Sequence, residues 1–377
     1  MYKVTFLLIF CLSFIKNQAQ YLSLPYDDSY GIPIVNVSIN GKNHQFAFDT
    51  GAFMTCINSE VFPNLLVSKI IDNVGGISSE RKSMNAVKFS FKIIDKEFEN
   101  KEVIYVDLNK TTQATCNNLI LGGIIGRDIM ENYIIEINPN DKKISFYIPS
   151  NFDKNKTQNF TKIKFQNNRP NIPISIGNHK RFVLFDTGSK GNLSISDVKL
   201  DQYISTTKHV AYRSKSSSFG IHGINNEEDL HHRIYNAEIE LGNSSVKNQL
   251  IETSNNDFNN MGFGFSKQFI SYLDLKNNKL FMKQVEQSVE KYEDSLLKSI
   301  GFSIIYNMEQ KRSNVTTLST ANNKLSLGDT IISINGETPP KNNCDTYSFL
   351  KKFVNSKMKI VIQRDNEIKE IDIAASV

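Results

Sequence analysis

The chain has 377 residues, of which 40% are hydrophobic and 22% are charged, and its formal net charge is +5. This length exceeds one typical domain, and the apolar content is enough for sizeable cores, so a globally disordered chain is excluded. The positive charge is small and scattered, which argues against a nucleic-acid-binding protein. The sequence therefore indicates a folded protein of two or three domains.

Residues 1–19 have the pattern of a signal peptide. Lys3 is followed by an apolar run from Val4 to Ile15 and by a short polar stretch that ends at Ala19. Because this run is short for a bilayer span, we expect it to be removed on export. The alternative is that residues 1–19 stay attached as a membrane anchor. The expected location is the periplasm, the cell envelope or the exterior, with no membrane span after removal of the signal.

The cysteines and histidines give little sign of redox or metal chemistry. Beyond residue 19 the chain has Cys56, Cys116 and Cys344, an odd number without CxxC spacing. Cys56 and Cys116 are candidates for a disulfide, and the spacing leaves that open. The six histidines include no HExxH motif. We therefore expect no metal and no cofactor.

The chain contains an internal repeat. Each copy reads as an alternating strand, a turn of Gly and Asn, an apolar strand and the triplet Asp-Thr-Gly. The matching segments are Pro33–Val37, Asn40–Gly41 and Phe46–Gly51 in the first copy, and Pro173–Ile176, Gly177–Asn178 and Val183–Gly188 in the second. This order of elements predicts two similar units that are mostly β.

The similarity continues downstream of the triplets. Ile124-Ile125-Gly126 in the first copy aligns with Gly262-Phe263-Gly264 in the second, and two apolar strands follow each segment. Asp49 lies 77 positions before Gly126 (126 − 49), and Asp186 lies 78 before Gly264 (264 − 186). The repeat predicts two lobes, at residues 21–150 and 165–283, joined through a polar linker.

Two Asp-Thr-Gly triplets at equivalent points predict a pair of carboxylates. Peptide hydrolysis without a metal needs a base for water and an acid for the leaving amine, and Asp49 and Asp186 could supply both by sharing one proton. Like charges at such short range cannot both ionise easily, so the titration belongs to the pair.

The residues around each Asp fit this chemistry. Phe48 and Phe185 end apolar strands and can anchor the two loops in a core. We expect the hydroxyls of Thr50 and Thr187 to lock the loops together across the lobe interface. Gly51 and Gly188 leave backbone N–H groups free to approach the carboxylates.

Residues 30–283 resemble the aspartic peptidases of the pepsin and retropepsin superfamily. The resemblance rests on the two triplets and the apolar-apolar-Gly strand, and it implies that Asp49 and Asp186 are catalytic. It also implies the two-lobed β-barrel fold of the acid proteases. Ala52 after the first triplet is similar to retropepsins, Ser189 after the second is similar to pepsin-like enzymes, and the short lobes look like a fused retropepsin pair.

The resemblance also implies a mobile hairpin, or flap, over the site. Residues 74–79 are the first-lobe candidate, with Gly75, Gly76 and Ile77 as substrate-binding residues. Residues 219–223 are a weaker counterpart in the second lobe. The alternative for each segment is an ordinary surface loop.

Residues 299–377 resemble a PDZ domain, which is an α+β fold. The most specific part is the run Gly328–Glu337, with a helix expected at 344–355 and a strand at 359–364. Residues 284–298 are the expected linker. The resemblance implies that the loop with Gly301 and Phe302 binds a peptide C-terminus. The alternative is a passive packing partner.

Together these features predict an exported aspartic-type endopeptidase that acts as a monomer on polypeptide substrates, with the PDZ-like domain docking substrate or regulating access. The alternative is a catalytically silent exported protein that binds peptides in its cleft and on the PDZ-like domain. Both triplets are intact, which favours the enzyme.

Overall fold

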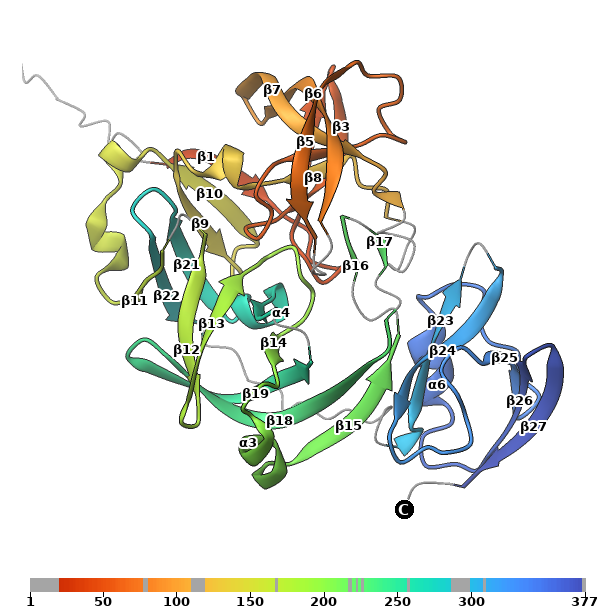
Figure 1. The fold of residues 1–377 in the computed structure, drawn as a ribbon. Helices are drawn as coiled ribbons and strands as arrows, with labels where there is room; N and C mark the ends of the chain where they lie inside the picture. Colours follow the sequence, from red (N-terminus) through yellow and green to blue (C-terminus); the bar gives the residue numbers. More distant parts are fainter. Residues whose placement is uncertain are drawn as a thin grey trace, which may run out of the picture.

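The computed structural model describes residues 20–76, 81–109, 119–166, 169–215, 219–221, 223–224, 227–255, 258–285, 299–307 and 310–374. The predicted signal peptide, Ile77 of the predicted flap, Cys116 and residues 286–298 of the predicted linker lie outside these ranges. The described residues form a mostly β fold with two similar lobes and a third, C-terminal unit (Figure 1). The predicted fold class, a two-lobed acid-protease β fold, is confirmed.

The first lobe is built on a seven-stranded sheet with the order β2-β3-β8-β4-β7-β6-β5. Its strands are β2 (Ile34–Ile39), β3 (Lys42–Phe48), β4 (Cys56–Asn58), β5 (Val67–Gly75), β6 (Arg81–Ile93), β7 (Lys96–Val106) and β8 (Gly123–Ile125), followed by helix α2 (Arg127–Met130). The β2–β3 turn has Asn40 and Gly41 with φ of 50° and 77°. Both values are typical of the two-residue turns that suit a twisted hairpin.

The second lobe repeats this topology. Its elements are β12 (Asn171–Ile176), β13 (His179–Phe185), β14 (Leu193–Ser196), α3 (Asp201–Thr206), β15 (His209–Ser214), β18 (Asp229–Leu241), β19 (Ser244–Ser254), β20 (Asn260–Met261) and α4 (Phe263–Ser266). Strands β3 and β8 pair in parallel, as do β13 and β20, and the hairpin β5–β6 corresponds to β15–β18. The internal repeat of the sequence is therefore a repeat of strand pairing.

A six-stranded sheet joins the two lobes. It has the order β1-β10-β9-β21-β22-β11, so that three strands from the first part of the chain lie beside three strands from the second part. Its strands are β1 (Gln20–Pro25), β9 (Ile134–Asn138), β10 (Lys143–Tyr147), β11 (Thr161–Lys164), β21 (Phe269–Asp274) and β22 (Lys279–Gln284). The halves meet where β9 pairs antiparallel with β21. Most of the large apolar core is continuous across this sheet.

The segment between the lobes is more structured than a plain linker. It contains the short 3₁₀ helices η2 (Pro149–Asn151) and η3 (Lys154–Thr157), and then β11, which pairs with β22. Ile163 and Phe165 are buried while Lys162 and Lys164 are exposed. This alternation is the pattern of a half-buried edge strand, which the polar composition of the segment concealed.

The C-terminal module, residues 299–374, has its own apolar core. Its elements are β23 (Phe302–Asn307), β24 (Arg312–Ser319), β25 (Thr330–Ile334), α6 (Thr346–Lys351), β26 (Met358–Arg364) and β27 (Glu367–Ile373). The helix is shorter than the predicted 344–355. Asp329 of the Gly-Asp motif is buried and receives two hydrogen bonds of 2.7 Å from Arg364, which explains the acid at this position. Among the described residues, no helix is long and apolar enough to cross a membrane.

Candidate active site

The two predicted aspartates stand at equivalent ends of strands β3 and β13. The backbone N–H of Asp49 donates to the carbonyl of Ile125 at 3.1 Å, and that of Asp186 donates to the carbonyl of Met261 at 3.0 Å. Phe48 and Phe185, directly before them, are fully buried. Each carboxylate is therefore carried by a loop that starts from a rigid, buried strand.

The structure corrects the alignment of the second apolar-apolar-Gly segment. Met261-Gly262 occupies the place of Ile125-Gly126, because β13 pairs with β20 at Met261 and Gly262 directly precedes helix α4. The aligned Phe263-Gly264 lies inside that helix. The true spacing from Asp186 is 76 positions (262 − 186). A Cβ at Gly262 would collide with the backbone of Gly191, so this turn requires glycine.

Thr50 and Thr187 bind each other's loops. The Thr50 hydroxyl donates to the carbonyl of Phe185 at 2.7 Å and accepts from the backbone N–H of Thr187 at 3.1 Å. The Thr187 hydroxyl donates to the carbonyl of Phe48 at 2.6 Å and accepts from the N–H of Thr50 at 3.1 Å. Both side chains are fully buried. Four hydrogen bonds thus hold the two loops in one fixed arrangement.

Gly51 and Gly188 each pack against the opposite aspartate. A Cβ at Gly51 would collide with the carboxylate of Asp186, and one at Gly188 would collide with that of Asp49. The carboxylates also accept backbone hydrogen bonds: Asp49 from Gly51 at 2.8 Å and Ala52 at 2.9 Å, and Asp186 from Gly188 at 2.9 Å. The two side chains therefore face each other as a dyad.

The two carboxyl groups have unequal electrostatic environments. Burial raises the pKa of Asp186 well above its ordinary value, and the neighbouring Asp49 raises it further. Burial also raises the pKa of Asp49, but hydrogen bonds from Asp186, Ala52 and Gly51 lower it. The two carboxyl groups therefore titrate as one coupled pair that can hold a single shared proton, and the pKa of Asp186 is shifted upward the more strongly.

Asn260 is a site residue that the sequence did not reveal. It is buried, and its side-chain Nδ2 donates to the second oxygen of Asp186, Oδ2, at 3.0 Å. The equivalent residue of the first lobe is the apolar Ile124, since Ala47 pairs with Ile124 as Leu184 pairs with Asn260. The only signal in the sequence is a polar residue directly before Met261-Gly262, and the shifted alignment obscured it.

Replacing Asn260 by Leu is expected to shift the pH dependence of hydrolysis. The Asn260 hydrogen bond favours the ionised form of Asp186 and lowers its pKa. Its loss should raise that pKa, so the alkaline limb of the pH–rate profile, which reports the loss of the proton shared by the pair, should move to higher pH. The profile of kcat/KM against pH measures this; a shift of the alkaline limb to lower pH would contradict it.

Asp128 and Thr55 brace the loop that follows Asp49. Asp128 of α2 accepts from both the backbone N–H of Thr55, at 2.7 Å, and its hydroxyl, at 2.8 Å. Burial raises the pKa of Asp128. Beside them the guanidinium of Arg127 stacks over the exposed ring of Phe53 at 5.6 Å from its centre. This stack brings a positive charge to the segment that follows Asp49.

The predicted flap residues belong to the first lobe, and the predicted peptide-binding residues belong to the C-terminal module. Gly75 ends strand β5 and Gly76 follows it, so both belong to the hairpin β5–β6, while Ile77 lies outside the described residues. Gly301 has φ of +84°, a value that favours glycine, and its carbonyl accepts from the N–H of Ser319 at 2.8 Å. Phe302 is fully buried in the core of the module.

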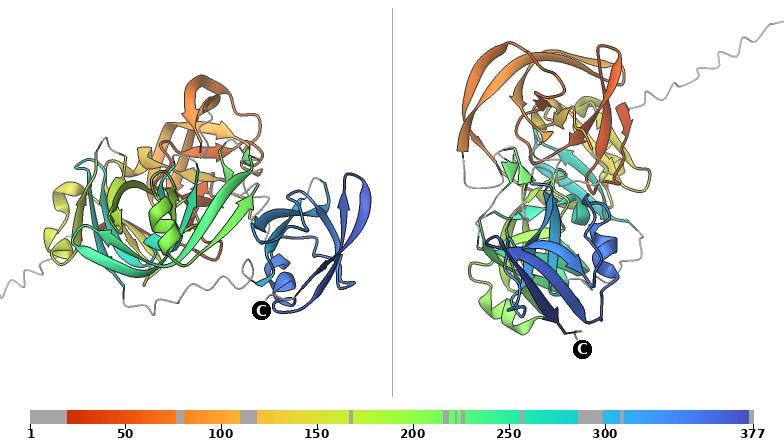
Figure 2. Two further views of the ribbon diagram at one scale, coloured as in Figure 1. Left: turned by 60° about the horizontal axis from the view of Figure 1, so that its bottom comes forward. Right: turned by 90° about the vertical axis from the view of Figure 1, so that its right-hand side faces the viewer.

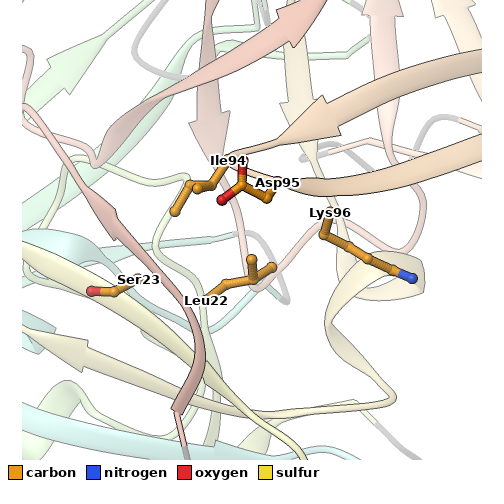
Figure 3. A pocket seen from close by; sticks show the side chains of 5 residues that line it. All are labelled: Leu22, Ser23, Ile94, Asp95 and Lys96. Atoms are coloured by element: carbon orange, nitrogen blue, oxygen red, sulfur yellow. The ribbon is translucent and has the colours of Figure 1, made fainter.

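A surface hollow elsewhere on the molecule does not belong to this site. Figure 3 shows its lining, Leu22, Ser23, Ile94, Asp95 and Lys96, which comes from β1 and the turn between β6 and β7. No residue of either Asp-Thr-Gly triplet lines it. In the part of the chain that the structure describes, no group of three or more His, Cys, Asp or Glu side chains is placed to hold a metal ion.

The two carboxylates face each other on equivalent loops, and part of the chain that carries them is similar to known proteins. Residues 31–138 match the family model described as retroviral aspartyl protease. The first lobe is similar to that family. The matched segment contains the first Asp-Thr-Gly triplet and Ile125-Gly126 of this retropepsin-like lobe.

A crystal structure of an aspartic proteinase from Irpex lacteus is also similar. The TM-score is 0.43 and the identity is 11%, over 71% of this chain and 98% of that chain. No curated protein sequence matches the chain.

Proposed function

We propose that the protein is an aspartic-type endopeptidase in which Asp49 and Asp186 activate water for the hydrolysis of peptide bonds. The observation that carries the proposal is the locked pair of loops, which holds two carboxyl groups against each other with the pKa of one raised well above that of a free carboxyl. The match of residues 31–138 to the retroviral aspartyl protease family supports the same reaction class.

The geometry suggests how the two groups divide the work. Ionised Asp49 takes a proton from a water molecule, whose oxygen attacks the scissile carbonyl carbon, while protonated Asp186 gives its proton to the carbonyl oxygen. The resulting tetrahedral diol collapses when Asp49 returns its proton to the amine nitrogen and the C–N bond breaks. Asp186 regains its proton from the diol, so the dyad ends as it began.

The other parts of the chain extend this proposal. Residues 1–19 direct export, which would place the enzyme in the periplasm, the cell envelope or the exterior. The C-terminal module would dock a peptide C-terminus of the substrate at the turn of Gly301, where φ is positive and favours glycine. Polypeptide is therefore the proposed substrate class, and the chain acts as a monomer because both carboxylates come from it.

Cleavage of an unstructured protein such as casein tests the proposal. Purified residues 20–377 should cleave casein with a bell-shaped pH dependence between pH 3 and 7. The acid limb reports protonation of Asp49, and the alkaline limb lies above the ordinary carboxyl range because the pKa of Asp186 is raised. Pepstatin, which occupies aspartic dyads, should inhibit it. A folded protein that neither cleaves casein nor binds pepstatin would instead support a silent binding protein.

A further inference from the structure

The C-terminal module continues the sheet of the second lobe. Strand β15 pairs antiparallel with β24 of the module, with Tyr212 opposite Ser319, Arg213 opposite Leu318 and Ser214 opposite Thr317. Backbone hydrogen bonds close both ends of this ladder: Thr320 N–H donates to Ala211 at 3.1 Å, and Lys215 N–H donates to Thr316 at 2.9 Å. Figure 2 shows the end of the second-lobe sheet against the module in its left view.

The strand that the module holds is one leg of the hairpin β15–β18 of the second lobe. Strands β15 and β18 pair as β5 and β6 do in the first lobe, so the hairpin β15–β18 corresponds to the hairpin that carries the predicted flap. Its tip contains the short strands β16 (Phe219–Gly220) and β17 (Gly223–Ile224). The two hairpins differ in one respect: β5 is the last strand of its sheet among the described residues, whereas β15 has partners on both edges.

One described residue of this tip, Ile221, reaches the first lobe. Ile221 packs against an apolar cluster of that lobe, together with Met54 and Ile124 from beside the catalytic loop. The core of the cluster is Ile32, Ile34, Ala47, Cys56, Ile104, Leu108, Leu119 and Leu121. In Figure 1, β16 and β17 lie between the first lobe and the module. The hairpin therefore bridges the two lobes that carry the dyad.

The pairing with β24 ends where the tip begins. Lys215, the last residue bonded to the module, lies only six positions before Ile221 (221 − 215). Glu228 on the returning leg lies 3.0 Å from Arg213 and 3.6 Å from Lys215, so ion pairs tie the neck of the tip together. Deeper in the hairpin, buried Tyr212 stacks on His231 and donates to Glu252 at 3.2 Å. Displacing the tip therefore strains the ladder to the module.

We propose that the C-terminal module is a brake on the active site: β24 holds β15, which keeps Ile221 packed on the first lobe beside Met54, and polypeptide reaches Asp49 and Asp186 when this ladder loosens. The inference rests on the proposed peptidase function. It gives the module a task inside its own chain, separate from any peptide docked at Gly301. A ligand or partner that shifts the module would regulate hydrolysis through the same strand.

Substitution at Arg213 tests the brake. Its pairing with Leu318 lies between the two hydrogen-bonded ends of the ladder, so its N–H points to β24, and Arg213→Pro removes that donor without touching the bonds to β18. Arg213→Ala is the matched control, because it also loses the Glu228 ion pair but keeps the N–H. Arg213→Pro should cleave casein roughly 2- to 10-fold faster than Arg213→Ala, the range set by one backbone hydrogen bond. An equal or slower rate overturns the proposal.

A reversible lock gives a second test that does not depend on the proline variant folding. Ser214 and Thr317 face each other at a non-hydrogen-bonded pair, a separation that suits a disulfide. The double variant Ser214→Cys/Thr317→Cys should cleave casein more slowly when oxidised and recover with reductant, while each single variant should not respond. Unchanged cleavage after mass spectrometry has verified the disulfide would overturn the brake.

Hydrogen exchange separates failure of the brake from failure of the peptidase proposal. Amides of fragments that contain Ile221 should exchange faster in Arg213→Pro than in Arg213→Ala, whether or not the protein cleaves casein. If the wild type cleaves nothing, the proposed function fails while this measurement still decides whether the module holds the tip. Equal exchange in the two variants counts against the brake even if the peptidase is active.

Discussion

Asp49→Asn and Asp186→Asn are each expected to lower kcat/KM for casein by at least about 10³-fold, because each removes one half of the shared acid–base pair. The loops should remain in place, since the hydrogen bonds between Thr50 and Thr187 do not involve the carboxylates. Asp95→Asn is a suitable control, as Asp95 is an exposed turn residue far along the chain from either triplet. Loss of activity in only one dyad variant would contradict a two-carboxylate mechanism.

Asp186→Asn should also raise the stability of the folded protein at neutral pH. The folded-state pKa of Asp186 is raised, so its contribution to stability is fully present below the ordinary carboxyl pKa and is lost as pH rises through the raised value. Asparagine carries no such charge. Asp186→Asn should therefore unfold at a higher temperature than the wild type at neutral pH, with the difference shrinking towards pH 3. A variant that is less stable at neutral pH would show that the carboxylate is not under electrostatic strain.

Thr50→Val and Thr187→Val are expected to be the most destabilising conservative substitutions at the site. Each removes one hydroxyl that both donates and accepts, and leaves a buried carbonyl and a buried N–H without a partner. Two such groups cost roughly 2–5 kcal/mol. Unfolding in urea measures the loss. Thr50→Ser, which keeps the hydroxyl, should cost about 1 kcal/mol or less for its missing methyl group.

The two threonines should also prove energetically coupled. The hydroxyl of Thr50 and that of Thr187 each make two separate hydrogen bonds, but all four bonds hold the same two loops against each other. Loosening the loops by one substitution already weakens the bonds of the other threonine, so the double variant Thr50→Val/Thr187→Val should lose clearly less stability than the sum of the two single losses. Strictly additive losses of stability would mean that each loop is held independently of the other in solution. Activity should fall together with stability in the single variants, since a loosened loop misplaces its carboxylate.

Much of the lobe architecture follows from local patterns in the sequence. The apolar strands that end at Phe48 and Phe185, and the turn at Asn40-Gly41, are where the alternation and the turn residues predicted them. These features depend on contacts close in sequence, so a single chain reveals them. The mostly β class follows from them in turn.

Other parts depend on contacts between distant strands and were not predictable. Two such contacts are the pairing of β9 with β21 and the pairing of β15 with β24. Each depends on which sheet edges meet when the lobes pack, and the residue pattern of a strand does not specify its partner. Asn260 was not identified as a site residue for a related reason. Gly264 lay at nearly the expected distance from Asp186, and only the register of β20 shows that Gly262 is the true counterpart of Gly126.

The hydrogen bond from Asn260 to Asp186 has a consequence for why both lobes reside in one polypeptide. Two identical subunits would surround their aspartates identically, and the shared proton would be degenerate between them. Here the first lobe presents Ile124 where the second presents Asn260, so the two aspartates have distinct neighbours. Covalent fusion allows each half to diverge alone, and this broken symmetry makes the surroundings of the two carboxyl groups electrostatically distinct.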